Sequence, residues 1–109
     1  IAYLHLIDHS APETPRTIPS EARSRLREAF RGPIISAGGH DSESGERSLL
    51  SGEAELIAIG RPFIGNPDLV ERLRGGHPLN DLDFSTFYGG GEAGYVDYPT
   101  LDRDGDACA

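Results

Sequence analysis

Two short apolar runs of this sequence end in residues that suit the binding of a phosphate group. Gly38-Gly39 follows the run Pro33–Ala37, and Gly60-Arg61 follows the run Leu56–Ile59. Glycine lets a backbone N–H approach an anion without an intervening Cβ, and arginine supplies a permanent, forked positive charge. If the runs are neighbouring strands of a parallel sheet, these residues converge at one edge on one phosphate. The alternative is structural, in that two glycine turns and a surface arginine happen to end two strands.

An aromatic pair, Phe87-Tyr88, precedes the glycine run Gly89–Gly91. Beside a phosphate-binding edge such a pair can line a flat ring or a substrate. The alternative is that both rings plug the rim of a barrel as part of its core. Composition does not separate the two interpretations.

The other chemistry-bearing residues do not suggest a further site. No two histidines share a helix at the i, i+4 spacing that presents two metal ligands together, so no metal site is predicted. The G-x-S-x-G elbow of hydrolases and the G-x-G-x-x-G dinucleotide fingerprint are both missing. The tail acids Asp102, Asp104 and Asp106 begin like a calcium loop, but the later ligands of that pattern do not follow.

Three apolar runs predict the strands that carry these turns. The run Ile1–Ile7 is β-branched, aromatic and aliphatic, which is typical of a strand buried on both faces in a parallel sheet. Pro33–Ala37 and Leu56–Ile59 are the second and third strands. A polar, proline-containing loop from His9 to Pro19 follows the first strand.

Three helices are predicted to alternate with the strands. The first begins at Pro19-Ser20 and ends near Phe30, and the second begins at Asp41 or Ser42 and ends near Ser51, with Gly52 as its C-cap. The third has Asn66 as N-cap, Pro67 in its first turn and Gly75 after its last turn. Apolar stripes are predicted at Ala22, Leu26, Ala29 and Phe30 of the first helix and at Leu69, Val70 and Leu73 of the third.

This order of elements predicts an α/β protein made of repeated parallel βα units. Three such units form either the end of a (β/α)8 barrel, which needs roughly 250 residues in all, or part of an open doubly wound sheet. Composition alone does not decide between these two architectures.

Composition limits the partners of the chain. Its 109 residues contain 18 Asp or Glu and 10 basic residues, all Arg, for a net charge of −8, which disfavours nucleic acids and anionic membranes as partners. No apolar run approaches the ~20 residues of a membrane span, and a cytoplasmic location is expected. The single Cys108 excludes an intrachain disulfide. Because the chain has no Met and opens inside an apparent strand, we expect a piece of a longer protein.

With these residues in place, the chain resembles the C-terminal segment of the Old Yellow Enzyme family of FMN-dependent ene-reductases. The resemblance is collinear over residues 1–101 and leaves only the tail 102–109, which is expected to be disordered. Its most specific part is the stretch Ile59–Leu73. The other matching segments are Tyr3–Leu6, Gly32–Ile35, Ala37–Gly39, Pro78–Asn80, Thr86–Gly91 and Gly94–Pro99.

The resemblance implies that the three strands are strands 6–8 of a (β/α)8 TIM barrel. It implies that Gly38, Gly39, Gly60 and Arg61 hold the phosphate of FMN. Phe87 would border the flavin and Tyr88 the substrate. The family uses NAD(P)H to reduce the flavin, which then reduces the activated C=C bond of a small-molecule alkene.

The resemblance also implies what this chain lacks. The His/His or His/Asn pair that holds the substrate carbonyl, and the proton-donating Tyr, belong to earlier strands, so no catalytic residue is assigned here. The cysteine cluster of the iron–sulfur relatives does not appear between Asn80 and Tyr88. We expect the isolated chain to bind FMN weakly and to reduce no alkene, its partner being the missing N-terminal part of the barrel. The alternative is an inactive remnant or assembly fragment.

Overall fold

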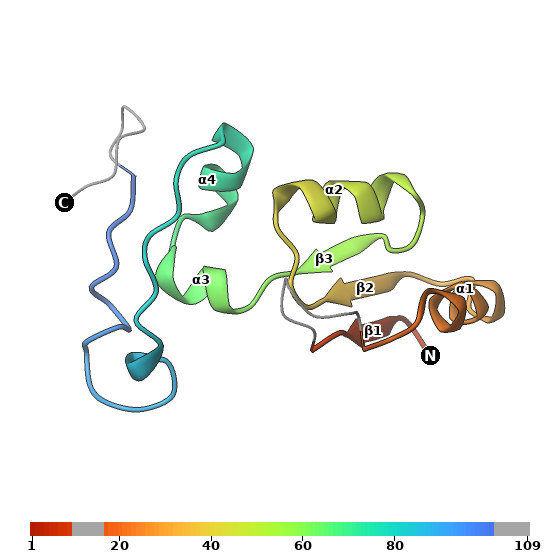
Figure 1. Cartoon of the computed structure of the whole chain (residues 1–109), viewed down its shortest axis with the longest axis horizontal. Coiled ribbons are helices and arrows are strands. Elements are labelled where there is room, and N and C mark those ends of the chain that lie inside the picture. Colours follow the sequence, from red (N-terminus) through yellow and green to blue (C-terminus); the bar gives the residue numbers. More distant parts are fainter. Residues whose placement is uncertain (10–16, 102–109) are drawn as a thin grey trace. The chain divides into compact units, whose positions relative to one another are not determined.

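The computed structural model of the chain describes residues 1–9 and 17–101. The chain forms two compact units, one ending at Ile59 and one beginning at Gly60, and each is described by itself. The first contains the three strands and the second contains helices α3 and α4 (Figure 1). The tail 102–109 and most of the loop predicted between His9 and Pro19 lie outside the described residues.

The first unit is built on a parallel sheet, as predicted. Its strands are β1 (Leu4–Ile7), β2 (Ile34–Ala37) and β3 (Leu56–Ala58), in the order β1-β2-β3. Each lies within a predicted run and is somewhat shorter than that run. Both pairings are parallel, with Leu4 opposite Ile34 and Ile35 opposite Leu56. The three predicted strands and their βα order are therefore confirmed.

The prediction that the first strand is buried on both faces is wrong. Burial alternates along β1, with Leu4 and Leu6 more covered than His5 and Ile7, and Ile7 stays 52% exposed. Successive side chains of a strand point to opposite faces of the sheet, so this alternation marks one covered face and one open face. The apolar run did not reveal this, because an apolar residue can occupy either face.

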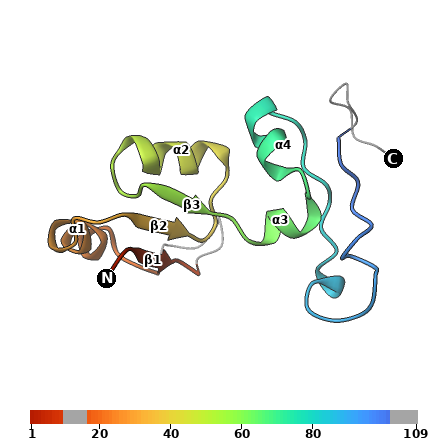
Figure 2. The same ribbon diagram turned by 180° about the vertical axis from the view of Figure 1, so that it is seen from behind.

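Helix α2 (Ser42–Leu50) follows β2 and lies alongside β3 (Figures 1 and 2). Asp41 is its N-cap and forms a reciprocal capping box with Ser44. At its other end Gly52 has a φ of +76°, and the N–H groups of Gly52 and Glu53 donate to the carbonyls of Leu49 and Ser48. This is the Schellman pattern that glycine favours, so the predicted helix and its glycine stop are confirmed.

Helix α1 (Ser20–Ala29) is also confirmed, but its predicted apolar stripe is wrong as a buried face. The buried residue is Arg23, at 7% exposure, whereas Leu26 is 36% exposed and Ala29 is exposed. The reason is the buried Asp8 at the end of β1, whose carboxylate pairs with the Arg23 guanidinium. A buried ion pair can therefore determine which face of a helix is buried, even where the apolar residues of that helix predict another face.

The second unit has two short helices where one was predicted. They are α3 (Arg61–Gly65) and α4 (Leu69–Gly75), followed by a single 3₁₀ turn, η1 (Phe84–Thr86). The predicted N-cap Asn66 is instead the residue that ends α3, and Asp68 precedes α4. Gly75 is the last residue of α4, and Gly76, with a φ of +66°, ends it in the left-handed conformation.

The predicted apolar stripe of this helix is correct only in part. Leu69 is buried at 1% exposure, Leu73 is intermediate, and Val70 is 55% exposed. The largest fully buried side chain of the unit is Arg72, at 1%. Burial in the second unit therefore follows polar side chains as much as apolar ones. Among the described residues, no helix is long and apolar enough to cross a membrane.

Candidate functional site

The two strand ends that carry the predicted phosphate ligands are neighbours in the sheet. Ala37 at the end of β2 is paired with Ala58 at the end of β3. Gly38 follows the first of these strands directly, and Gly60 comes two residues after Ala58. In parallel βα folds, ligands bind at this carboxyl edge.

The glycine turn after β2 needs glycine for its own geometry. Gly38 has a φ of +110° and Gly39 a φ of +63°. A Cβ added at Gly38 would collide with the carbonyl oxygen of Asp8. Within the described part of the chain, the N–H groups of Gly38 and Gly39 donate no hydrogen bond. The turn is thus required by the backbone, and it also leaves two N–H donors available to an anion.

Buried polar side chains support this turn from the strand side. The Asp8 carboxylate, 3% exposed, accepts hydrogen bonds at Oδ1 from the backbone N–H (2.8 Å) and hydroxyl (2.9 Å) of Thr17. Its Oδ2 lies 2.8 Å from Nη2 of Arg23. On β2, the buried Ser36 hydroxyl lies 2.9 Å from Nε2 of His40, the residue after the two glycines. The ends of β1 and β2 are therefore held by side-chain hydrogen bonds as well as by the backbone hydrogen bonds of the sheet.

Gly60 and Arg61 begin the second unit. Gly60 is the N-terminal cap of α3, and Arg61 is the first residue of that helix and is exposed. Within the part of the chain that the structure describes, its guanidinium forms no ion pair or hydrogen bond. A free, exposed guanidinium can bind an anion in bidentate fashion. Because Arg61 and the glycine turn belong to different units, their convergence on one phosphate stays a prediction.

The aromatic residues of the second unit form a small cluster of rings. The ring centroids of Phe84 and Phe87 are 4.8 Å apart, and the ring of Tyr88 packs edge-on against Phe87 at 6.0 Å. Phe87 is partly covered, whereas Phe84 is 63% and Tyr88 87% exposed. In the described residues the side chain of Tyr88 is thus largely exposed. The cluster offers flat apolar area of the type that an aromatic ligand uses.

Asp41 and Asp68, the residues that precede α2 and α4, have structural roles. The backbone N–H and the hydroxyl of Ser44 hold the pKa of Asp41 below its ordinary value. Burial opposes ionisation of Asp68, yet the N–H of Leu101 and the Arg72 guanidinium donate to its carboxylate and bring its pKa below the ordinary value. Both carboxylates are therefore charged and occupied at neutral pH.

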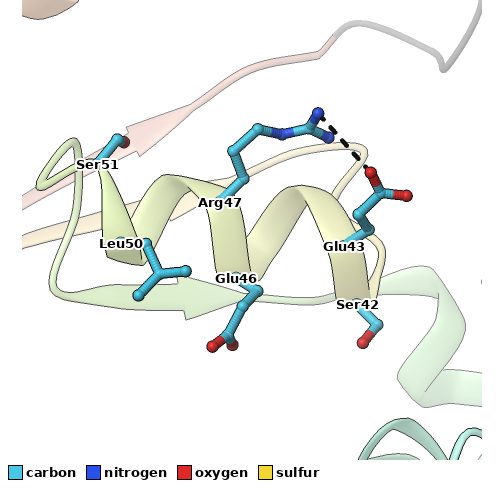
Figure 3. A pocket seen from close by; sticks show the side chains of 6 residues that line it. All are labelled: Ser42, Glu43, Glu46, Arg47, Leu50 and Ser51. Carbon is cyan, nitrogen blue, oxygen red and sulfur yellow. Dashed lines mark ion pairs between the residues drawn. The ribbon is translucent and has the colours of Figure 1, made fainter.

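A surface hollow of the first unit, lined by α2 and its C-cap, is not a candidate cofactor site. It runs along the outer face of α2, and Figure 3 shows its side chains, with Arg47 reaching toward Glu43 at 3.9 Å. Every lining residue comes from this helix or its C-cap, so no second element can enclose a ligand there. No cluster of three or more metal-binding side chains occurs among residues 1–9 and 17–101.

Sequence patterns missed the buried polar groups behind the site. The Asp8–Arg23 pair has no sequence signal, because its members are 15 residues apart. Asp68 and Arg72 are four residues apart, a spacing that favours an ion pair on a helix, so that signal was available. The buried amide of Asn66 was mistaken for a cap because it precedes Pro67.

The fold and the site together define a class: parallel βα units that present glycine turns and an arginine at the carboxyl ends of two strands. The family model described as NADH:flavin oxidoreductase / NADH oxidase matches residues 1–80. The chain belongs to this family, and its resemblance to the Old Yellow Enzyme family of FMN-dependent ene-reductases is confirmed.

Individual relatives agree with this assignment. The chain is 49% identical over 98 residues to "Putative 12-oxophytodienoate reductase 12" of Oryza sativa subsp. japonica. This match covers 89% of this chain and 24% of that relative. It is 39% identical over 104 residues to "12-oxophytodienoate reductase 2" of Arabidopsis thaliana, covering 94% and 28%.

Solved structures give the same result for the fold. Morphinone reductase matches with a TM-score of 0.86 and 43% identity over 98% of this chain and 29% of its own. Its complex with tetrahydroNAD matches with a TM-score of 0.81 and 45% identity, over 95% and 27%. The chain is therefore part of a (β/α) barrel, and it spans about a quarter of the length of the relatives it matches.

Proposed function

We propose that this chain supplies the phosphate end of an FMN site in a larger oxidoreductase that reduces activated C=C bonds with NAD(P)H. Membership of the NADH:flavin oxidoreductase / NADH oxidase family supports the flavin. The morphinone reductase complex with tetrahydroNAD supports a nicotinamide reductant for that relative and, by extension, here. The proposal takes the three strands as strands 6–8 of the barrel.

The observation that carries the proposal is the set of unused donors at two adjacent strand ends. The N–H groups of Gly38 and Gly39 and the guanidinium of Arg61 have no partner among the described residues. Gly60 lacks a Cβ, so its backbone too can approach an anion closely. These donors are of the types that a phosphate dianion needs, namely several N–H groups and a compensating charge.

The aromatic loop, residues 81–98, which carries Phe84, Phe87 and Tyr88, would serve the other end of the cofactor. In this proposal Phe87 borders the flavin ring, and the exposed Tyr88 faces the substrate. When bound, FMN would supply hydride chemistry, accepting a hydride from NAD(P)H and passing it to the β-carbon of an alkene conjugated to a carbonyl. The residues of this chain would bind and orient the cofactor and shield it from water, and none of them is assigned a catalytic role.

The remaining strands of the barrel are the proposed partner, in the same or a separate chain. Two apolar side chains on the open face of the sheet, Ile7 and Leu56, are 52% and 55% exposed. Parallel sheets are normally covered on both faces, and barrel closure covers the inner one. We therefore expect the 109-residue chain alone to bind FMN weakly and to reduce no alkene.

The test compares FMN with riboflavin, which has the same ring system and no phosphate. Both are titrated, by flavin fluorescence, into the chain and into a chimera in which it replaces the segment of morphinone reductase that it matches. Arg61→Ala should weaken FMN binding about ten- to a hundredfold and leave riboflavin binding unchanged, because only FMN engages the guanidinium.

The matched control is Arg74→Ala, which removes an exposed arginine of α4 in the same unit. It should leave both affinities unchanged. Equal weakening of FMN and riboflavin by Arg61→Ala would contradict the phosphate role. A chimera that folds but binds neither flavin would favour the alternative of an inactive remnant.

A further inference from the structure

The second unit contains a cluster of polar side chains that a binding role does not explain. It consists of Asn66, Asp68, Arg72 and Asn80, called here the polar cluster. Asn66 is 0% and Arg72 1% exposed, so neither side chain can reach a cofactor or substrate directly. Burying a charge and an amide costs free energy unless each is fully hydrogen-bonded. The hydrogen-bond partners of these side chains therefore indicate the role of the polar cluster.

Arg72 uses all three of its nitrogens, each on a different segment. Its Nε lies 2.8 Å from Oδ1 of Asp68, which precedes the same helix. Its Nη1 donates to the carbonyl of Pro78 at 2.6 Å, and its Nη2 to the carbonyl of Pro99 at 3.0 Å. The planar fork of arginine therefore joins two segments that are far apart in the sequence.

The two asparagines extend the same connection to α3. Asn66 donates to the carbonyl of Pro62 at 2.7 Å and accepts at Oδ1 from the N–H of Asn80 at 2.8 Å. The side chain of Asn80 donates to the carbonyls of Gly65 (2.8 Å) and Pro99 (2.7 Å). Pro62 is the residue next to Arg61, so these bonds lead from the proposed phosphate ligand to the later segments.

The segments joined in this way are the two ends of the aromatic loop, residues 81–98. Residues 78–80 hold its start, and at its end the N–H of Leu101 donates to Oδ2 of Asp68 at 2.6 Å. Within the loop the backbone bonds are local, as in Thr86 to Asp83 and Val96 to Glu92. The polar cluster thus ties both ends of the loop that carries Phe87 and Tyr88 to α3 and α4.

We propose that Arg72 and Asn80 are positioning residues that fix the aromatic loop for the flavin ring and the substrate. This inference rests on the proposed function, because the rings matter only if a flavin binds. It assigns the flavin site two separable parts, with Arg61 acting on the phosphate and the polar cluster acting on the ring. In this proposal both residues act through the loop, and the Arg72 side chain is too deeply buried to touch the ligand.

The first experiment measures amide exchange by NMR in the whole 109-residue chain. Arg72→Lys keeps the charge, but one ammonium cannot reach all three acceptors of the fork. The N–H groups of Asp83, bonded to the Tyr98 hydroxyl, and of Leu101 should exchange about tenfold faster. Arg74→Lys, on the exposed side of α4, is the control and should change neither rate.

Asn80→Ala is the second variant, because it removes two side-chain bonds without leaving a buried charge unpaired. It should accelerate exchange at Leu101 as well, while the amides of α2 in the first unit keep their rates. Unchanged exchange at Asp83 and Leu101 in both variants would overturn the proposal. So would exchange at the unstructured rate throughout 60–101 in the parent chain, since the cluster would then hold nothing by itself.

The second experiment separates this inference from the proposed function, using the chimera and both flavins. Arg72→Lys and Asn80→Ala should weaken FMN and riboflavin by the same factor, about fivefold to tenfold, and raise the KM for an enone more than they lower kcat. A loss restricted to FMN, as for Arg61→Ala, would overturn the ring assignment. If the parent chimera binds neither flavin, the proposed function fails, and amide exchange alone still decides whether the cluster holds the loop.

Discussion

Among the described residues, each unit buries an Asp–Arg ion pair, and the two pairs are embedded differently. In the first unit Arg23 bonds to Asp8 at 2.8 Å, and its Nε has no hydrogen-bond partner within residues 1–9 and 17–101. In the second unit Arg72 bonds to Asp68 at the same distance, and its two remaining nitrogens reach carbonyls of distant segments. The first pair joins a helix to a strand end, whereas the second joins several parts of its unit.

This difference follows from the backbone of each unit. In the first unit the parallel ladder joins β1 to β2 and β2 to β3 through backbone hydrogen bonds and fixes the strand order. In the second unit the residues from 60 to 101 form short helices, a single 3₁₀ turn and irregular segments. Side chains must supply the hydrogen bonds there that a ladder supplies elsewhere. A buried arginine therefore contributes most to the stability of the unit that has the least regular secondary structure.

The largest expected effect tests this comparison directly. Arg72→Met should lower the free energy of unfolding by about 3–5 kcal/mol, because it removes the charge partner of Asp68 and three hydrogen bonds of a buried guanidinium, although Leu101 still donates to Asp68. Arg23→Met should lower it by roughly 2 kcal/mol, because fewer bonds are lost and Thr17 still donates to Asp8.

Urea unfolding followed by circular dichroism measures both values, with the exposed Arg74→Met as a control expected to stay within about 0.5 kcal/mol of the parent. An Arg23 variant as damaging as the Arg72 variant would show that the two pairs carry equal structural weight.

A smaller effect is expected at the glycine turn of the first unit. Gly38→Ala should cost about 2–4 kcal/mol of unfolding free energy, because the new Cβ meets the Asp8 carbonyl and the φ is +110°. Gly52→Ala is the matched control, with a positive φ of +76° and nothing within 4 Å, and should cost only about 1 kcal/mol. Equal losses of unfolding free energy in the two variants would mean that the backbone at Asp8 moves aside without cost. The positive φ would then account for the whole effect.

The smallest expected effect has the opposite sign. Gly45 lies inside α2, and a Cβ there would contact the Ile57 side chain at ordinary distances of 3.6 and 3.7 Å. Gly45→Ala should therefore raise the free energy of unfolding by about 0.5–1 kcal/mol, through helix propensity alone. A thermal melt of the two proteins checks this. A lower midpoint in the variant would show that the space between α2 and β3 is tighter than it appears.

In the first unit, local patterns were sufficient to locate the strands and the ends of α2, because those signals lie within a few residues of one another. They did not predict which faces of β1 and α1 are buried. The apolar runs predicted β1, β2 and β3, and Asp41 and Gly52 predicted the ends of α2. Gly38, Gly39, Gly60 and Arg61 were placed after their strands correctly, because a strand end is itself a local event. Their joint role at one phosphate was inferred from the family and stays a proposal.

The sequence by itself therefore determined the order of strands and helices along the chain, the glycine turns and the family of this protein. Only the tertiary structure decided which arginines are buried, where α3 ends and what holds the aromatic loop. The physical reason is distance along the chain. Arg23 is buried because of Asp8, 15 residues away, and Arg72 because of Pro99, 27 residues away. A buried charge is stable only when such partners surround it, and no periodicity in the sequence marks where they will be.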